Sequence, residues 1–438
     1  MAKVVKFGGS SLADANQFRK VAEIIRSDRE RRYVVPSAPG KRFSEDTKVT
    51  DMLYRCYEAV GRGKNATAEF LPIAERFNGI IGDLGLTINL DHEYDIIAEN
   101  FRKRAGKDYA ASRGEYLNGI ILANYLGFQF VDAAKCIYFT ASGEFDADLT
   151  DACLASVLEG YAEAVIPGFY GAKPDGTIQT FSRGGSDFTG SVVAKAINAD
   201  LYENWTDVSG FLAADPHIVD DPEIIEYITY KELRELSYMG AGVLHQDAIF
   251  PVRTAKIPIN IRNTNVPDAK GTMIVPEAPE NADNKIITGI AGKKHFSVIS
   301  IEKDEMNSEV GFLRRILTVL DNEGMGFEHI PTGIDTMSLV VSTEELEAHP
   351  DAVKYINQVC RPNHIEVIND LALVAIVGRG MKEKKGTATR IFAALSHANI
   401  NIKMIDQGSS ELNIIVGIHE KDFEKAVQVI YDMFMLSE

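Results

Sequence analysis

Two glycine turns in the chain combine residue types suited to holding phosphate. The first lies in residues 2–12, where an apolar run leads through Lys6 to Gly8, Gly9 and Ser10. Glycines let the backbone lie close against a ligand, free N–H groups at the start of a helix stabilise phosphate oxygens, and lysine supplies a compact positive charge. A Gly-Gly turn beside a lysine is also common in ordinary loops, so this stretch needs support from other parts of the chain.

The second turn runs from Arg183 through Gly184, Gly185 and Ser186 to Asp187, ahead of an amphipathic helical stretch. An arginine fork can hold a carboxylate with two hydrogen bonds, and the aspartate can order either a lysine or a hydrated Mg²⁺. Two such turns, each between a strand and a helix, are hard to explain as coincidence. Together they predict a phosphate-binding site.

Three further stretches place polar groups beside predicted elements. Ser37 follows an apolar strand, in a turn that either lines a ligand or only reverses the chain. Glu115 precedes a helix expected to begin at Tyr116, and it either caps that helix or accepts hydrogen bonds from a substrate ammonium. Thr206 and Asp207 follow another strand, in a polar loop suited to a nucleotide.

Strand and helix patterns alternate through the first two thirds of the chain. Helices are expected over residues 16–25 and 47–60, and strands over 33–35, 128–134 and 164–169. This alternation predicts a layered α/β domain with a mainly parallel sheet, whose ligands bind at the carboxyl ends of the strands.

Composition limits the class of protein. A chain of 438 residues, 45% apolar and 25% charged, predicts two or three globular domains. A net charge of −17 argues against nucleic acid and acidic membrane surfaces as partners. The four cysteines have no metal-binding or disulfide spacing, and no apolar run approaches the roughly 18 residues of a membrane span. We therefore expect a cytoplasmic protein with no nucleic-acid or membrane partner.

The last 150 residues contain an internal duplication. Gly311 aligns with Gly386, 75 positions later, and the same offset aligns Arg315 with Arg390. In the first copy, strands are expected over residues 296–301, 326–332, 336–342 and 364–368, and helices over 310–323 and 344–360. The second copy ends at a helix and lacks room for its last strand. An unpaired sheet edge would follow, so we expect the strand-like segment 286–291 to complete the second copy.

Taken in order, VVKFGGSS, VVPSAPG, SRGE, TFSRGGSDFTG, WTDVSGF and VLHQDAIFPV resemble the successive signatures of the aspartokinases, within the wider amino acid kinase family. The duplication resembles paired ferredoxin-like βαββαβ ACT domains. The resemblance implies a three-layer α/β/α kinase domain over residues 1–284, a first ACT domain over 295–369, and a split second ACT domain over 285–292 plus 370–438. Since the chain stops at Glu438, no appended homoserine dehydrogenase is expected.

Aspartokinases transfer the γ-phosphoryl group of ATP to the side-chain carboxylate of L-aspartate, the first step toward lysine, threonine and methionine. A carboxylate is already a nucleophile, so the enzyme must mainly position two anions and neutralise charge. The resemblance implies ATP and Mg²⁺ as cofactors, with no direct metal ligand from the protein. It assigns catalysis to Lys6, Arg183 and Asp187, aspartate binding to Ser37, Thr50, Glu115, Arg183 and Ser186, and nucleotide binding to Lys6, Gly8, Gly9, Ser10, Thr206, Asp207 and Asp215.

Two positions depart from the family pattern. Many members have an arginine where this chain has His217, and a lysine where it has Gly242. Both missing cations would face ATP phosphates. Lys41 or Arg42, which follow the Ser37 turn, are candidates to compensate.

The ACT resemblance implies regulation by an amino acid, lysine or threonine or both, and a homodimer or dimer of dimers formed through the ACT domains. The expected effector-binding residues are Met306, Gly311, Phe312, Leu313 and Glu328. From the residues alone, a surface turn and a solvated acid are the favoured interpretation, and only the ACT resemblance makes effector binding about equally plausible. The alternatives to an aspartate kinase are a catalytically inactive amino acid sensor and another amino acid kinase.

Overall fold

The structure is a computed structural model that describes residues 1–438 except 183, 243, 245, 280–281, 283–284 and 436–438. The chain divides into a first unit of Met1–Phe211, Ile224–Tyr230 and Val243–Pro279, and a second unit of Leu212–Glu223, Lys231–Gly242 and Glu280–Glu438. Two segments from the middle of the chain therefore group with its C-terminal part. None of the described helices is both long enough and apolar enough to cross a membrane.

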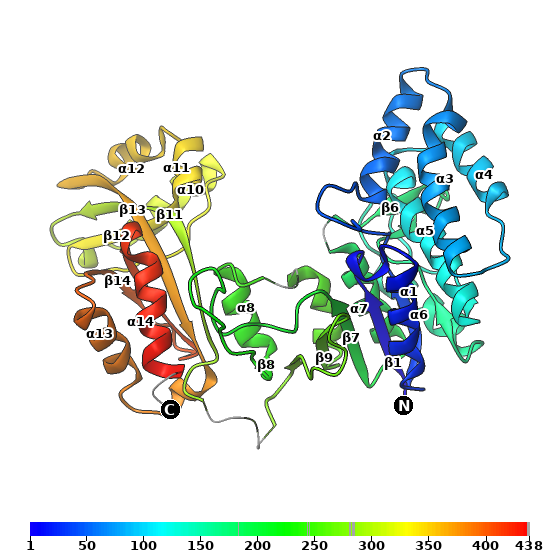
Figure 1. The fold of residues 1–438 in the computed structure, drawn as a ribbon. Coiled ribbons are helices and arrows are strands. Elements are labelled where there is room, and N and C mark those ends of the chain that lie inside the picture. Colours follow the sequence, from blue (N-terminus) through cyan, green and yellow to red (C-terminus); the bar gives the residue numbers. More distant parts are fainter. Residues whose placement is uncertain (183, 243, 245, 280–281, 283–284, 436–438) are drawn as a thin grey trace. The chain divides into compact units, whose positions relative to one another are not determined.

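The first unit contains an eight-stranded sheet in the order β3-β4-β2-β1-β7-β9-β10-β8 (Figure 1). Neighbouring strands run parallel except β9 and β10, so the predicted mainly parallel sheet is confirmed. The strands are β1 (Lys3–Phe7), β2 (Arg31–Pro36), β3 (Gln129–Phe130), β4 (Ala164–Val165), β7 (Leu201–Thr206), β8 (Tyr227–Thr229), β9 (Ile259–Asn263) and β10 (Thr272–Val275), and a separate hairpin joins β5 (Tyr170–Ala172) to β6 (Ile178–Thr180).

Helices cover both faces of this sheet because side chains alternate along its central strand β1. Val5 and Phe7 join the apolar core formed with α1 to α5, whereas Lys6 points to the opposite face and contacts Asp187 of α7. This arrangement gives the α/β/α layers that the family resemblance implied. The helices are α1 (Ala15–Arg26), α2 (Val49–Gly61), α3 (Ala66–Asp83), α4 (Asp91–Arg102), α5 (Lys107–Leu126), α6 (Ala147–Glu159), α7 (Gly185–Ala196) and α9 (Phe250–Thr254).

Three predicted elements of the first unit differ from the structure. The strands expected over residues 128–134 and 164–169 are each two residues long, as β3 and β4. The helix expected to begin at Tyr116 begins nine residues earlier, at Lys107. Gly114 has a low helix propensity, so the sequence did not indicate a helix across this residue. In the structure, a Cβ at Gly114 would lie 2.7 Å from Cβ of Ala38, so this glycine lets α5 pack tightly against the loop after β2.

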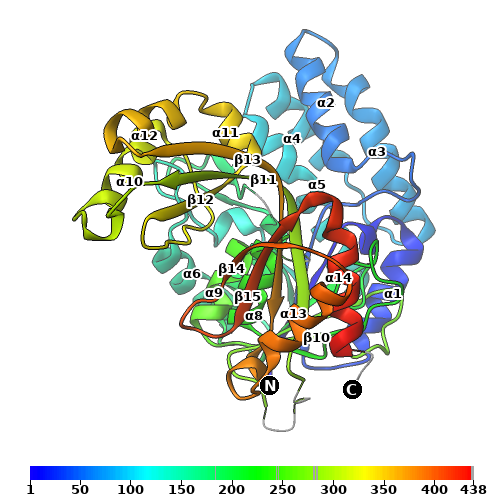
Figure 2. The ribbon, with the colours of Figure 1, turned by 90° about the vertical axis from the view of Figure 1, so that its left-hand side faces the viewer.

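The second unit contains a five-stranded antiparallel sheet in the order β12-β11-β13-β15-β14 (Figure 2). Its strands are β11 (Gly289–Glu302), β12 (Thr336–Ser342), β13 (His364–Val377), β14 (Ile402–Asp406) and β15 (Asn413–His419). Its helices are α10 (Phe312–Glu323), α11 (Thr343–Ala348), α12 (Ala352–Cys360), α13 (Thr387–His397), α14 (Phe423–Met435) and all but the first residue of α8 (Tyr230–Tyr238).

The long strands β11 and β13 serve both copies of the duplication. Residues 289–293 of β11 pair with residues 373–377 of β13, beside β15, whereas residues 296–302 pair with 364–371 and with β12. The aligned residues Gly311 and Gly386 both precede a helix with left-handed φ values of 83° and 87°, which glycine adopts without strain.

Two elements of the first copy are less regular than the sequence pattern indicated. Residues 326–332, expected as a strand, form only single bridging pairs, His329 with Val340 and Thr332 with Met337. The helix expected over residues 344–360 is divided into α11 and α12 at Pro350, since proline cannot donate the hydrogen bond that a helix interior requires.

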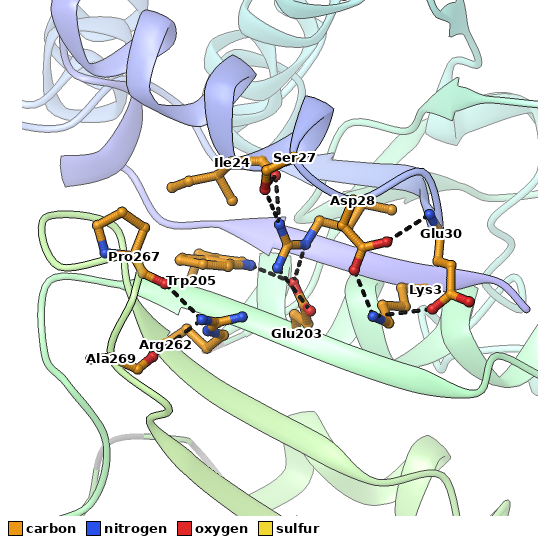
Figure 3. A network of polar contacts seen from close by, with 11 residues as sticks. Lys3, Ile24, Ser27, Asp28, Glu30, Glu203, Trp205, Arg262, Pro267 and Ala269 are labelled. Carbon is orange, nitrogen blue, oxygen red and sulfur yellow. Dashed lines mark hydrogen bonds and ion pairs between the residues drawn. The ribbon is translucent and has the colours of Figure 1, made fainter.

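A buried ion pair connects strands of the first sheet (Figure 3). Nε of Arg31 on β2 lies 2.8 Å from Oε2 of Glu203 on β7, and both side chains are almost completely buried. The indole of Trp205 donates to the same carboxylate at 2.8 Å, and Arg31 also donates to the carbonyl of Ile24 on α1. The guanidinium of Arg262 on β9 lies over the Trp205 ring. One polar network therefore joins α1, β2, β7 and β9.

Removing the charge of Glu203 should destabilise the first unit, because it leaves Arg31 buried without a counter-charge. We expect Glu203→Leu to lower the free energy of unfolding by about 3–5 kcal/mol, and the double variant Arg31→Met, Glu203→Leu to recover most of that loss. Urea unfolding of the three proteins measures both effects. An equal loss in the single and double variants would show that the unpaired charge is not the cause.

Candidate active site

A cavity of about 640 Å³ in the first unit gathers residues from the loops after β1 and β2, from α2 and α5, and from the end of β7. The carboxyl ends of parallel strands meet at one sheet edge, which explains how residues far apart in sequence come together. Its walls carry backbone groups, hydroxyls, cations and acids. Eight residues predicted for the site line it: Gly8, Gly9, Ser10, Ser37, Thr50, Glu115, Thr206 and Asp207.

Two glycines hold the loops of this cavity in backbone contact. The N–H of Gly40 donates to the carbonyl of Gly9 at 2.8 Å. A Cβ at Gly40 would lie 2.6 Å from the carbonyl carbon of Gly9, and a Cβ at Gly9 would lie 2.8 Å from the carbonyl oxygen of Ala38. Neither position has room for a side chain, so both turns depend on glycine.

The first glycine turn leaves two N–H groups for a ligand. The N–H of Gly8 donates to the carbonyl of Trp205, whereas those of Gly9 and Ser10 donate to no residue in the described part of the chain. These two N–H groups lie at the start of a short 3-10 helix, Ser10–Leu12, and not at the start of the amphipathic helix as predicted. That helix, α1, begins only at Ala15, where the Asp14 side chain accepts from the N–H of Gln17.

Lys6 and Asp187 form the central charged pair of the site. Lys6 Nζ lies 2.6 Å from Asp187 Oδ1, and Lys6 is only 7% exposed. Lys6 and Asn204 are opposite each other in the pairing of β1 with β7, so the Asn204 amide also reaches Asp187 Oδ1, at 2.7 Å. The carboxylate is thereby fixed in orientation.

Our sequence reasoning missed Asn204. Its signal is a second polar residue, directly after Glu203, in the short strand that ends at Thr206.

Glu115 is a buried acid on the wall of the cavity. It is 6% exposed, and its Oε2 has no hydrogen-bond partner among the described residues. Burial raises its pKa to about 8, although a hydrogen bond from the Ala38 backbone acts in the opposite direction. Because α5 begins at Lys107, the interpretation of Glu115 as a helix cap is wrong. A buried acid with a free oxygen is suited to a cationic ligand.

The other predicted residues of the site lie in different surroundings. Ser186, on α7, is buried against Gly168. Arg183 lies outside the residues that the structure describes. Asp215 belongs to the second unit and is exposed, and its carboxylate lies 2.9 Å from Nδ1 of His217.

Gly242, the position where family members carry a lysine, also belongs to the second unit. It is exposed, and a Cβ there would meet nothing within 4 Å. A side chain would therefore fit at position 242 without a clash with the described residues.

The predicted effector residues divide into two groups. Met306 and Phe312 are buried in the core of the first copy, Gly311 precedes α10, and Leu313 is 39% exposed. Glu328 instead accepts a hydrogen bond from the hydroxyl of Tyr238 on α8.

The raised pKa of Glu115 predicts a pH-dependent stability. The unfolded chain releases this proton near pH 4.5, whereas the folded protein keeps it until about pH 8. The free energy of unfolding of the ligand-free protein should therefore fall as pH rises between these values. Glu115→Gln removes this contribution, so the variant should gain stability relative to the parent as pH rises. Urea unfolding at several pH values measures the effect, with the exposed acid variant Glu75→Gln as control. Parallel pH profiles for parent and Glu115→Gln would contradict it.

Comparisons with known proteins identify the family. The Amino acid kinase family matches residues 1–263, and the ACT domain matches residues 374–434. Aspartokinase 3 of Bacillus subtilis (strain 168) is 37% identical over an alignment of 448 residues that covers 99% of this chain and 98% of that protein.

Solved structures agree over the whole chain. Aspartate kinase from Clostridium acetobutylicum, 52% identical, superposes with a TM-score of 0.90 and covers 99% of each chain. E. coli aspartokinase III in complex with lysine and aspartate, in its T-state, is 25% identical with a TM-score of 0.73, again over 99% of each chain. From its catalytic sheet to its C-terminal repeat, the protein therefore belongs to the amino acid kinase family and, within it, to the aspartokinases.

Proposed function

We propose that the protein is an ATP-dependent aspartate kinase, which transfers the γ-phosphoryl group to the side-chain carboxylate of L-aspartate and releases 4-phospho-L-aspartate and ADP. The observation that carries this proposal is one cavity lined by two free backbone N–H groups and a buried acid with a free oxygen, next to the Lys6–Asp187 pair. The product would enter the biosynthesis of lysine, threonine and methionine.

Aspartate binding is assigned to the side of the cavity that contains Glu115. The ammonium of L-aspartate would approach the free Oε2, and its positive charge would lower the pKa of Glu115 and ionise it. Ser37 and Thr50 line the same cavity and offer hydroxyls to the carboxylates. Arg183 and Ser186 are proposed to complete the aspartate site.

Phosphoryl transfer is assigned to the first glycine turn and Lys6. The attacking carboxylate needs no general base, so these groups act by position and charge. Lys6 Nζ lies 3.7 Å from the place where a Cβ at Gly8 would stand, directly behind the turn whose Gly9 and Ser10 N–H groups are free. Lys6 would stabilise charge on the transferred group, and Asp187 would hold Lys6 in place.

The nucleotide would contact Thr206 and Asp207, which line the cavity of the first unit. The role of Asp215, which belongs to the second unit, stays a prediction. Among the described residues, no group of three or more His, Cys, Asp or Glu side chains is arranged to hold a metal ion. Mg²⁺ in kinases is commonly held by phosphates, water and one or two carboxylates. We therefore propose that Asp187 and Asp207 would hold a hydrated Mg²⁺ bound together with ATP, which would supply positive charge to the phosphates.

The alternatives are less well supported. An inactive sensor would not need Lys6, Asp187 and Asn204 in one hydrogen-bonded group, which the first unit contains. Another amino acid kinase is disfavoured by the likeness to aspartokinases over the full chain.

Trapping with hydroxylamine tests the reaction, because an acyl phosphate forms a coloured hydroxamate. With ATP and Mg²⁺, we expect product from L-aspartate and none from L-glutamate or N-acetylglutamate. Lys6→Met should lower kcat about 100- to 1000-fold, because it removes a charge that stabilises the transition state. Lys20→Met, an exposed lysine on α1, is the matched control and should retain the parent rate. Product from another acceptor alone would refute the proposed substrate.

The second unit is proposed to regulate the enzyme through two ACT domains, over residues 295–369 and over 285–292 plus 370–438. The division of β11 and β13 between the two copies supports this proposal, as does the ACT match at residues 374–434. Exposed apolar residues of this unit, among them Val310 and Ile334, support a homodimer or dimer of dimers. We also propose a cytoplasmic location, where ATP and free amino acids are supplied.

The effector is proposed to be lysine, threonine or both, bound near residues 306–313 with its ammonium on Glu328. E. coli aspartokinase III, a structural relative, has been solved with lysine, which supports an amino acid effector. Helix α8 is attached to this unit by buried Glu232, which accepts hydrogen bonds from the Thr288 hydroxyl and the Arg379 backbone. At the C-terminal end of α8, the Tyr238 hydroxyl donates a hydrogen bond to the Glu328 carboxylate.

An effector ammonium would therefore compete with Tyr238 for Glu328. We expect Tyr238→Phe to lower the effector concentration for half-inhibition about fivefold, the equivalent of one hydrogen bond of about 1 kcal/mol, and Glu328→Gln to raise it. Inhibition of the kinase by lysine and by threonine measures both changes, with Tyr355→Phe on α12 as control. Identical inhibition curves for all variants would refute the assigned role of Glu328.

A further inference from the structure

At the positions where the family pattern has cations facing ATP, this chain supplies less positive charge. ATP and L-aspartate together bring several negative charges, and like charges brought together repel strongly unless they are neutralised. His217 and Gly242 replace two expected cations. Three cations on the cavity wall instead come from one short stretch between β2 and α2: Lys41, Arg42 and Lys48.

Arg42 is occupied by a structural ion pair. Its Nε and Nη2 lie 2.7 and 2.9 Å from the two carboxylate oxygens of Asp46. Arg76 binds the same carboxylate at 2.7 Å and also donates to the carbonyls of Ala13 and Gly40. The two arginines hold the pKa of Asp46 well below its usual range. This group fixes the loop, so the guanidinium of Arg42 is already neutralised.

Lys41 is partly engaged as well. Its Nζ donates to the carbonyl of Ser44 at 2.9 Å, within the same exposed loop. A carbonyl satisfies one donor of the ammonium without neutralising its charge. The N–H that Lys41 donates to Ser44 could bind a ligand only after this hydrogen bond is broken.

Lys48 differs from both neighbours. Its ammonium forms no hydrogen bond or ion pair with any residue that the structure describes, and its side chain is exposed on the cavity wall with Thr50 and Glu115. Its backbone is nevertheless fixed, because its carbonyl accepts from Met52 in the first turn of α2 and the N–H of Val49 donates to Pro39. A fixed backbone with a free ammonium is suited to a mobile, highly charged ligand.

We propose that Lys48 binds phosphate oxygens of ATP and supplies positive charge that this chain lacks at positions 217 and 242. The inference rests on the proposed aspartate kinase function and adds a nucleotide-binding residue to its cavity. Phosphate is favoured over the substrate as the partner, because the triphosphate carries the larger charge and because Glu115 in the same wall is assigned to an ammonium, which Lys48 would repel.

Lys48→Met tests the proposal, since methionine keeps the unbranched stem and removes the charge. One charge-assisted hydrogen bond corresponds to about a 10- to 100-fold effect. We expect kcat/KM for ATP and the affinity for ADP, measured by calorimetry, to fall by that factor. Lys48→Arg should retain most of both values, and the dependence of ADP affinity on salt should be weaker in Lys48→Met than in the parent.

The matched control is Lys107→Met, an exposed lysine at the start of α5 and outside the cavity. It should leave kinetics and ADP affinity unchanged. Values for Lys48→Met within twofold of the parent would overturn the proposal. So would a loss confined to kcat/KM for aspartate with unchanged ADP affinity, because Lys48 would then serve the substrate carboxylate. A parent protein without kinase activity would refute the proposed function, and ADP affinity would still decide the role of Lys48.

Discussion

The site depends on the close backbone contact between Gly9 and Gly40. This contact brings the loop after β1 against the loop after β2 at a distance that no side chain permits. Arg76 strengthens it by donating to carbonyls of both loops, at Ala13 and Gly40. The glycine turn therefore has a rigid support on one side, and on the other side Gly8 is bonded to β7 through Trp205. Rigid N–H groups stabilise developing charge without reorganising during the reaction.

The charges of the cavity are balanced for bound ligands. Without ligands, Glu115 is held neutral at pH 7 by burial, and Lys6 is neutralised by Asp187. A substrate ammonium would restore the charge of Glu115, and phosphates would meet Lys41 and Lys48, which form no ion pair with any described residue. Such an arrangement binds two anions together without a large unbalanced charge in the free protein.

The course of the chain links catalysis to regulation. Residues 212–223 and 231–242 belong to the second unit but are continuous in sequence with strands and helices of the first. In α8, Glu232 and Tyr238 are bonded to residues of the C-terminal part, whereas Tyr230 belongs to the first unit and donates to the carbonyl of Ile257. A shift of α8 in response to an effector would therefore be transmitted through the backbone to residues of the catalytic unit.

The sequence by itself determined the fold class, the family, the internal duplication and most cavity residues, because glycine turns and alternating apolar runs are local patterns. Only the tertiary structure decided what depends on contacts between distant segments. The start of α5 at Lys107, ahead of the SRGE motif, turned Glu115 from a helix cap into a buried cavity acid. The pairing of β1 with β7 placed Asn204 beside Asp187. The ion pair with Asp46 neutralised Arg42, whereas Lys48 has no ion pair among the described residues. Burial, register and competition between neighbouring charges are properties of packing, so no single stretch of sequence specifies them.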